Sequence, residues 1–374
     1  MFKAIRYRAY PTQEQLSQIW LTIHSARAIY NIMLAAKIDH YAAEKKMLYN
    51  TPAQYKADRP WLRDADSSAL ANAQINLEKA FNNFFNEPNA GFPKFKARAK
   101  AKKSYTTNIV KGKRNLRFEG NCFRLPKVGF VKIKKHRTAP TDWKIKSATV
   151  EIAPTGKCFI SVLFEYENQV PKVAPNKIIG LDYSSPHLYV DSEGNMPDFE
   201  KPFRKYQAKL AREQRKLCKM REDAKKAKRP LRECKNYQKQ KIKVAKVYEK
   251  IANCRLDALH KLSLALAEDY DAVAVEDLNM KDMSQGLNLG KSTMDNGYGM
   301  FLKMLEYKLE NRGKQLVKVG KWYPSTKTCS CCGSVKPMRL GEDTYACPVC
   351  GSVIDRDVNA AINIREEAKR ILST

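Results

Sequence analysis

The sequence is poor in acidic residues and in histidine, and it has no long apolar run. Asp and Glu number 39 against 69 Lys and Arg, so the formal net charge is +30. An excess of this size repels itself in the folded chain, which favours a polyanionic partner over a merely soluble basic protein. The five histidines show no ligand-like spacing. No apolar run reaches the roughly 18 residues that a membrane-spanning helix needs, so we expect no membrane association.

The N-terminal stretch also lacks a feature, the apolar core of a secretory signal peptide. It reads MFKAIRYRAYPTQEQ, which predicts an intracellular, cytoplasmic protein. Paired cysteines in a reducing compartment favour zinc over disulfides. At 43% hydrophobic residues over 374 positions, the chain is expected to be globular, with two or three domains.

Two Cys-x-x-Cys pairs give the strongest local signal. They are separated by 14 residues, and each is followed by glycine, which allows the left-handed backbone after the second ligand. Two such knuckles can close a tetrahedral thiolate site, and a closed site is structural rather than catalytic. Cys331 also lies in the first pair but has the wrong spacing. The predicted Zn²⁺ ligands are Cys329, Cys332, Cys347 and Cys350.

Hydrophobic periodicity outlines the N-terminal half. Residues 3–10 alternate as a strand, and a capping-box pattern at 12–15 opens a helix that is predicted to end near Lys46. A second helix is predicted over 67–85, with Ile75 on its buried side. Short alternating strands between 117 and 166 predict a small β-barrel that also takes in the first strand.

Two segments concentrate the positive charge. Residues 89–116 carry nine Lys/Arg, no acid and several aromatic rings, which suits phosphate contact and base stacking, although a solvated basic loop is the alternative. Residues 201–255 carry 21 Lys/Arg against 5 Asp/Glu on two predicted helices, about 201–219 and 231–269. The nearly uniform sign favours nucleic-acid contact. The polar stretch 281–296 is predicted to be a mobile loop.

Three carboxylates stand at the ends or starts of predicted elements. Asp182 ends the apolar run KIIGLD, Glu276 ends DAVAVE, and Asp357 begins the last helix. Each alone is as readily a cap or a surface residue. Together, on one edge of a mixed sheet, they would supply oxygen ligands for two Mg²⁺ ions about 3.5–4 Å apart, the arrangement that hydrolyses phosphodiesters.

Several motifs, taken together and in their order along the chain, resemble those of the TnpB (OrfB) family. Members of this family are transposon-encoded RNA-guided DNA nucleases related to the type V CRISPR effectors. The motifs are IIGLDY, VAVEDLNM and the terminal CPVCGSVIDRDVNAAINI, with RAYPTQEQ, HKLSLALAEDYD, DNGYGMF and YPSTKTCSCCG between or before them. Two departures stand out. Ser184 replaces the second glycine of the family's Gly-x-Asp-x-Gly, and Tyr298 stands where the family often has Trp.

The resemblance implies an α/β multi-domain protein. Its RNase-H-like (RuvC) mixed-sheet nuclease would comprise 177–325 and 352–374, with the basic helical insertion 200–269 and a zinc ribbon at 326–351. A wedge β-barrel would comprise 1–10 and 115–172, and it would carry a helical recognition lobe with the basic loop at 11–114.

The resemblance also assigns roles. Asp182, Glu276 and Asp357 would be the catalytic triad, holding Mg²⁺ or Mn²⁺. Asp357 is preferred to Asp355 because Asp-x-Asn-Ala-Ala is the family motif, and Asp355 is expected to shape the turn. The partners would be one guide RNA from the transposon end, bound by a monomer, and double-stranded target DNA in a prokaryotic cell, where the protein would join the nucleoid when bound to DNA.

In RNA-guided systems base pairing reads most of the target, while the protein reads a short flanking motif. The rival interpretations are a catalytically silent RNA-guided repressor and a transposase. The candidate nucleic-acid contacts are Tyr49, Ser67, Ser68, Lys94, Lys96, Arg98, Lys102, Lys103, Tyr105, Thr106, Thr107 and Asn108.

Overall fold

The chain folds into two compact units, Met1–Glu167 and Asn168–Thr374. The computed structural model describes residues 1–167, 170–279, 295–339 and 341–373. Most of the predicted loop at 281–296 therefore lies outside the described residues. None of the helices in these described ranges carries an apolar stretch that would cross a membrane.

The N-terminal unit is built on a seven-stranded antiparallel sheet. Its strand order is β2-β6-β7-β1-β5-β4-β3. Among the described residues no pairing joins β2 to β3, so the sheet is not closed into the predicted barrel by hydrogen bonds. The strands are β1 (Phe2–Tyr10), β2 (Ser104–Asn108), β3 (Arg117–Glu119), β4 (Cys122–Leu125), β5 (Gly129–Lys134), β6 (Lys144–Ile152) and β7 (Cys158–Glu165).

Strand β2 was not predicted, because it lies at the end of the basic segment. Its side chains alternate between the core and the surface, as a strand with one buried face requires. Tyr105 and Thr107 point inward and are 4% and 0% exposed. The strand pairs with β6 from Ser104↔Glu151 to Asn108↔Ser147. The sheet therefore includes part of the predicted basic loop.

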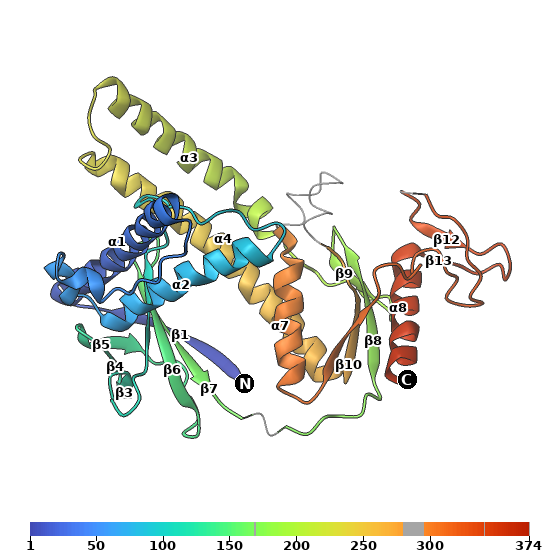
Figure 1. Cartoon of the computed structure of the whole chain (residues 1–374). Helices are drawn as coiled ribbons and strands as arrows, with labels where there is room; N and C mark the ends of the chain where they lie inside the picture. The colour runs from blue at the N-terminus through green and yellow to red at the C-terminus, as the bar shows by residue number, and fades with distance from the viewer. Residues whose placement is uncertain (168–169, 280–294, 340, 374) are drawn as a thin grey trace. The chain divides into compact units, whose positions relative to one another are not determined.

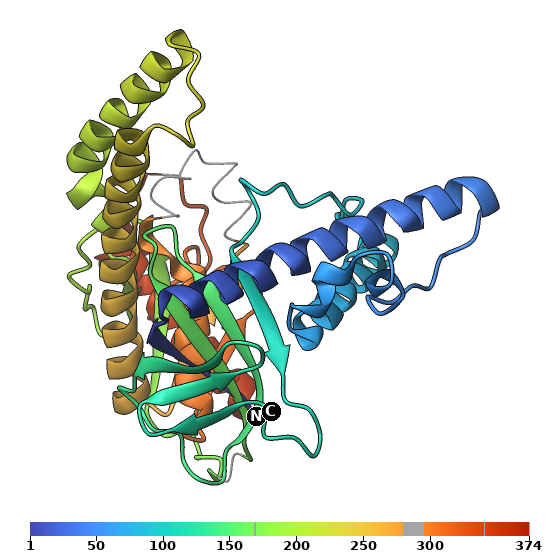
Figure 2. The same ribbon diagram turned by 90° about the vertical axis from the view of Figure 1, so that its left-hand side faces the viewer.

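A long helix, α1 (Gln13–Glu44), crosses this sheet and extends past it (Figure 2). Its predicted capping box is present: the Thr12 side chain accepts from the Gln15 amide, and the Gln15 side chain accepts from the Thr12 amide. The first half of α1 packs on the sheet through Ile19 and Ile23. Its second half shares a core with α2 (Ser67–Asn86) and with Leu62 of a short 3₁₀ turn. The two 3₁₀ turns are η1 (Gln54–Lys56) and η2 (Pro60–Arg63).

One prediction for α2 was wrong. Ile75 is 53% exposed, whereas Leu70, Ala73 and Leu77 form the buried side. Ile75 follows Ala73 by two residues, a spacing that points to a different face of a helix.

The C-terminal unit contains the predicted mixed sheet, in the order β11-β10-β8-β9. Strands β8 (Ile178–Ser184), β10 (Ala272–Glu276) and β11 (Gln315–Val319) are parallel, and β9 (Leu188–Asp191) is antiparallel to β8. Helices α4 and α7 cover one face of the sheet, and α8 covers the other (Figure 1).

The helices of this unit lie close to their predicted positions. They are α3 (Pro202–Lys226), α4 (Lys235–Asp269), α7 (Tyr298–Glu310) and α8 (Arg356–Ser373). Helices α3 and α4 form a hairpin with a small core of its own, which contains Leu210, Val244, Val247 and Ile251. A short two-stranded sheet pairs β12 (Thr344–Ala346), inside the predicted zinc ribbon 326–351, with β13 (Val353–Asp355), which follows that range.

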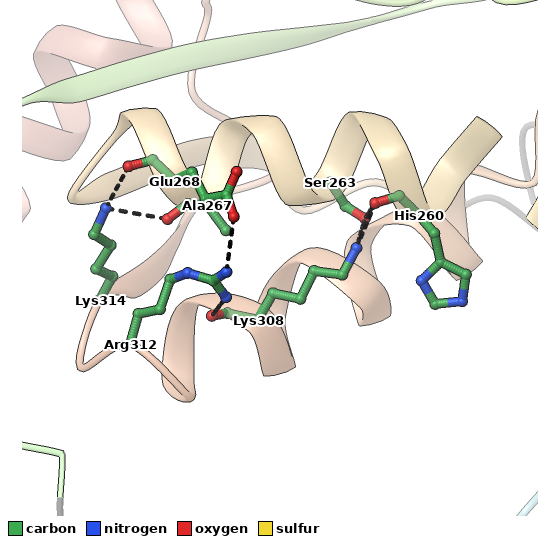
Figure 3. Close-up of polar contacts among 7 residues, drawn as sticks. All are labelled: His260, Ser263, Ala267, Glu268, Lys308, Arg312 and Lys314. Atoms are coloured by element: carbon green, nitrogen blue, oxygen red, sulfur yellow. Dashed lines mark hydrogen bonds and ion pairs between the residues drawn. The ribbon is translucent and has the colours of Figure 1, made fainter. Parts of the chain in front are cut away.

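Polar contacts fasten α7 to α4 (Figure 3). The buried Lys308 ammonium donates to the His260 carbonyl at 2.6 Å and to Ser263 Oγ at 2.7 Å. Arg312 pairs with Glu268, and Lys314 Nζ donates to the carbonyls of Ala267 and Glu268 near the end of α4. A cation at a helix C-terminus compensates the exposed carbonyl dipoles there. Burial lowers the pKa of Lys308 to about 8.

Candidate catalytic and metal sites

Asp182 and Glu276 lie side by side on one face of the mixed sheet. Strands β8 and β10 pair in parallel with Leu181 opposite Val275, so the next residue of each strand is level with the other. Side chains alternate along a strand. Residues Gly180 and Ala274 face α8, and Asp182 and Glu276 therefore face it too. Glu276 ends β10, whereas Asp182 does not end its strand as expected: β8 continues two residues further to Ser184, where it pairs with β9.

Helix α8 brings Asp357 to the same edge. A Cβ added to Gly180 would overlap the carbonyl oxygen of Ala361 and lie 2.7 Å from the amide nitrogen of Arg365, so α8 touches the β8 backbone there. From Gly180 to Asp182 the strand advances about 7 Å. From Ala361 back to Asp357 the helix covers about 6 Å. Strand β8 and helix α8 run in opposite directions (Figure 1). From these two lengths, Asp357 is expected to lie level with Asp182.

The charges in this cluster influence one another. Burial raises the pKa of Asp182 well above its usual value, and the nearby Asp357 and Glu276 raise it further. Burial also raises the pKa of Glu276. The positive charge of Arg356 partly offsets the rise in the pKa of Asp182. The Arg356 guanidinium donates to Asp357 Oδ1 from Nε at 2.9 Å and from Nη2 at 2.7 Å. Three carboxylates with a single guanidinium form a site that favours cations.

The triad is less tightly gathered than the cysteines. Within the described ranges, the four cysteines are the only group of three or more His, Cys, Asp or Glu whose ligand atoms all lie within 4.8 Å of one another. The acids are close enough for their charges to couple, while Arg356 holds one oxygen of Asp357. Asp355 has a different task. Its Oδ1 accepts from the amides of Asp357 and Val358 at 2.9 and 3.0 Å and so caps α8.

The two cysteine pairs form matching knuckles. Cys329 and Cys350 have their sulfurs 3.7 Å apart, and Cys332 and Cys347 have theirs 3.6 Å apart. Four thiolates around a tetrahedral Zn²⁺ with bonds of about 2.3 Å are about 3.8 Å apart. The donor set and its spacing therefore fit a zinc ion, and as four thiolates they leave no position open for a substrate.

The local backbone supports these knuckles in the predicted way. Gly333 and Gly351 follow the two pairs with φ of 76° and 72°, in the left-handed region. A serine comes next in each knuckle. Ser334 Oγ lies 3.1 Å from the sulfur of Cys347, and Ser352 Oγ lies 3.4 Å from that of Cys329. The sequence repeat Cys-x-x-Cys-Gly-Ser is a signal from which these hydroxyl contacts could have been predicted.

The predicted nucleic-acid contacts lie in the N-terminal unit, in varied surroundings. Tyr49 is 89% exposed, whereas Tyr105 and Thr107 are buried in the sheet and do not face solvent. Lys96 is half-buried, with its ammonium 3.6 Å from the Tyr30 ring centre, and burial lowers its pKa. Ser67 and Ser68 open α2 behind the N-cap Asp66. The exposed basic residues are Lys94, Arg98, Lys102 and Lys103.

A cavity of about 360 Å³ lies between α1, α2 and β2. Amide side chains from α2 line it. The Asn72 amide donates to the Thr106 carbonyl at 2.9 Å, and Asn108 donates to Asn72 Oδ1 at 3.4 Å. Asn72 was missed by sequence reasoning, because a helical Asn carries no signal until its face is known. The polar lining residues are Arg27, Asn72, Asn76, Lys96, Lys102, Ser104 and Thr106.

Sequence reasoning also missed the roles within DNGY, residues 295–298. Asp295 is 2% exposed and accepts from the amides of Phe203 and Arg204 at the start of α3, at 2.9 and 3.3 Å. It also pairs with Arg255 of α4 at 3.2 Å. Asn296 donates to the Ser185 carbonyl at 2.9 Å, just beyond β8. This segment ties the helical hairpin to the strand that carries Asp182.

Sequence comparisons agree with the class that this fold defines, an α/β protein with a cluster of acidic residues at one sheet edge and a four-cysteine cluster that could hold zinc. A family model described as "Probable transposase" (OrfB_IS605) matches residues 161–286. A model described as "Cas12f1-like, TNB domain" matches 298–364. A third, described as "Helix-turn-helix domain" of the same family, matches 1–46. In this chain that last stretch is a strand followed by one continuous helix.

The chain belongs to the OrfB_IS605 (TnpB) family. It is 30% identical, over 97% of its length and 88% of the relative, to a "Putative RNA-guided DNA endonuclease" of Streptomyces pristinaespiralis. It is 29% identical, over 99% of its length and 93% of the relative, to "Putative RNA-guided DNA endonuclease InsQ" of Escherichia coli K12.

The fold also resembles that of a solved protein. A chain in the "Cryo-EM structure of the Cas12f1-sgRNA-target DNA complex" superposes with a TM-score of 0.61. The superposition covers 98% of both chains at 14% sequence identity. At this identity the similarity concerns the fold alone.

Proposed function

We propose that this protein is an RNA-guided DNA endonuclease that hydrolyses phosphodiesters at Asp182, Glu276 and Asp357. The observation that carries the proposal is the convergence of these three acids at one sheet edge, from positions 175 residues apart at the extremes. The full-length similarity to relatives named for this activity supports it.

The protein's own groups have simple tasks in this reaction. When bound, two Mg²⁺ or Mn²⁺ ions would supply an activated water and would stabilise the leaving oxygen. The three carboxylates would hold the ions, and no nucleophilic side chain is required. Because Asp182 is buried, where the effective dielectric constant is low, it interacts more strongly with nearby charges than an exposed carboxylate would. Cys329, Cys332, Cys347 and Cys350 would hold a structural Zn²⁺.

The basic surfaces would bind the nucleic acids. The α3–α4 hairpin carries most of the 21 Lys/Arg of residues 201–255, on helices whose buried side is a narrow apolar seam. A guide RNA transcribed from the transposon end would lie there, with one protein monomer to one RNA. Salt-dependent binding is expected, because each phosphate contact releases counterions.

The flanking DNA motif would be read in the N-terminal unit. Tyr49, Ser67, Ser68, Thr106 and Asn108 remain candidates, while the buried Tyr105 and Thr107 would act only through packing. The amide-lined cavity adds Asn72 and Asn76, since Asn side chains can pair with base edges.

Conservative triad variants test the catalytic assignment. Asp182→Asn, Glu276→Gln and Asp357→Asn should each abolish metal-dependent cleavage of a guide-matched target and leave RNA binding intact. Glu366→Gln is the matched control, because Glu366 lies on α8 but makes only surface ion pairs with Arg365 and Lys369. Full cleavage by the Glu276 variant would remove Glu276 from the site.

Sequencing the RNA that copurifies with the protein tests the guided interpretation. One defined RNA that ends at the element boundary supports it, and heterogeneous RNA contradicts it. Target binding without cutting would instead indicate a silent repressor.

The description of the matching family model keeps a transposase as the second candidate. A strand-transfer assay on transposon ends separates the two. Joined transposon ends would favour transposition, whereas cleavage without joining supports the nuclease.

A further inference from the structure

Buried side chains join helix α8 to residues 326–351, which carry the four cysteines and are called the cysteine ribbon. Asn359 lies on the first turns of α8 and is 0% exposed. Its Oδ1 accepts from the amide of Ser330 at 2.9 Å, and its Nδ2 donates to the carbonyl of Thr328 at 2.8 Å. Both partners flank Cys329. Asn359 therefore holds the first knuckle by one donor and one acceptor, which fixes its orientation.

The second half of the ribbon, at residues 342–343, forms hydrogen bonds with Arg356, the residue before Asp357. The Arg356 amide donates to the carbonyl of Asp343 at 2.9 Å, and Arg356 Nη1 donates to that of Glu342 at 3.0 Å. The same guanidinium holds Asp357 Oδ1. Asp357 is thus bracketed by residues that bind the two halves of the ribbon. The Tyr345 hydroxyl links the two halves by donating to the carbonyls of Lys327 and Ser334, and a metal ion held by both knuckles would fix the halves relative to each other.

We propose that Asn359 is a positioning residue through which zinc in the cysteine ribbon sets the orientation of Asp357 in the catalytic site. This role for zinc goes beyond stabilising the fold of the ribbon, and the inference rests on the proposed catalytic triad. Without zinc, Ser330 and Thr328 would no longer be fixed relative to residues 342–343, and the first turn of α8 would lose one of its two supports. Residues that orient metal ligands from outside typically change metal affinity about 10- to 100-fold.

Mn²⁺ binding to the full chain, measured by electron paramagnetic resonance, tests this without relying on cleavage. The Asp182→Asn/Glu276→Gln double variant gives the background from any other Mn²⁺ site. Removing zinc with a zinc-selective chelator, followed by dialysis, should weaken triad-dependent Mn²⁺ binding at least about tenfold. Circular dichroism verifies that helix content is retained.

Asn359→Ala should weaken Mn²⁺ binding to a similar degree with zinc still bound, and zinc removal should then add less than about threefold. Asn363→Ala is the matched control. Asn363 also binds the first knuckle, donating to the carbonyls of Ser325 and Thr328 at 2.8 and 2.7 Å, but one turn further from Asp357. Asn363→Ala should lower the melting temperature by about as much as Asn359→Ala does, and it should change the Mn²⁺ affinity less than about threefold.

Coupling between sites is reciprocal, which gives a second measurement. Bound Mn²⁺ should raise the zinc affinity of the wild-type protein, measured by equilibrium competition with a chromophoric chelator, and should not raise that of Asn359→Ala. Equal Mn²⁺ losses in the two Asn variants, or unchanged Mn²⁺ affinity after zinc removal, would overturn the inference and leave the nuclease proposal standing. If the wild-type protein showed no triad-dependent Mn²⁺ binding, both this inference and the nuclease proposal would be refuted.

Discussion

Replacing Gly180 by alanine should displace α8, the helix that carries Asp357, while leaving the strand's own conformation unstrained. The φ of Gly180 is not in the left-handed region, so an L side chain is allowed there. The obstacle is α8, whose backbone atoms at Ala361 and Arg365 occupy the space of the new methyl group. Backbone atoms of a packed helix cannot rotate away as a flexible side chain can.

The structure gives a minimum size for the displacement. Ordinary contact begins near 3.4 Å and the Arg365 nitrogen would be at 2.7 Å, so the two elements must separate by at least 0.7 Å, with more required at Ala361. Overpacking of this kind costs about 3 kcal/mol. Asp357 moves with α8, and a misplacement near 1 Å lowers a rate about 100-fold.

Thermal unfolding and target cleavage, measured on the same preparation, check this. For a unit of this size, a loss of about 3 kcal/mol lowers the melting temperature by about 6–12 °C. Gly299→Ala is the control: nothing lies within 4 Å of its added Cβ, and it sits in α7, so stability should rise by up to about 1 kcal/mol. A Gly180→Ala protein with unchanged melting temperature and cleavage would refute the close packing of α8 on β8.

Three further changes have defined outcomes. Asp295→Ala removes the carboxylate that pairs with Arg255 and caps the first amides of α3, and should cost about 3 kcal/mol in urea unfolding, because Arg255 Nε keeps its bond to the carbonyl of residue 295. The folded pKa of Lys308 is about 8 against 10.5 in the unfolded chain, so its charge opposes folding at neutral pH. Relative to Lys308→Met, the wild-type protein should therefore gain stability as pH rises from 8 to 10.5, by at most about 3 kcal/mol in denaturant titrations. Cys347→Ser, or zinc chelation, should lower the melting temperature and solubility, because thiolate–zinc binding contributes folding energy.

Much of the C-terminal unit could be predicted because its signals are local. Apolar runs ending in Asp182 and Glu276 gave the parallel strands, and paired cysteines followed by glycine gave the knuckles. The choice of Asp357 over Asp355 needed the family motif. The structure supplies its physical reason, since Asp355 is engaged in capping α8.

The remainder depends on contacts between distant segments. Asp295 and Asn359 are ordinary polar residues in the sequence, and only the fold shows that one caps α3 and the other holds a knuckle. Strand β2 was hidden by the lysines before it, although Tyr105 and Thr107 alternate as a half-buried strand should. Ile75 shows the reverse error, an apolar residue that the tertiary structure leaves exposed.

The helical hairpin has a consequence for how compact this protein can become. Its base is fixed by Asp295 and Arg255. Beyond the base, the described residues of α3 and α4 pack on each other through the seam around Leu210 and Val244 and through a hydrogen bond from Gln240 to Glu213. Whole turns can therefore be removed in matched pairs from the tip, around residues 218–236, without disturbing any residue of the mixed sheet. Trimming there would yield a shorter chain in which Asp182, Glu276 and Asp357 keep their positions. If the hairpin binds RNA as proposed, the length of RNA in contact with it would shorten as well.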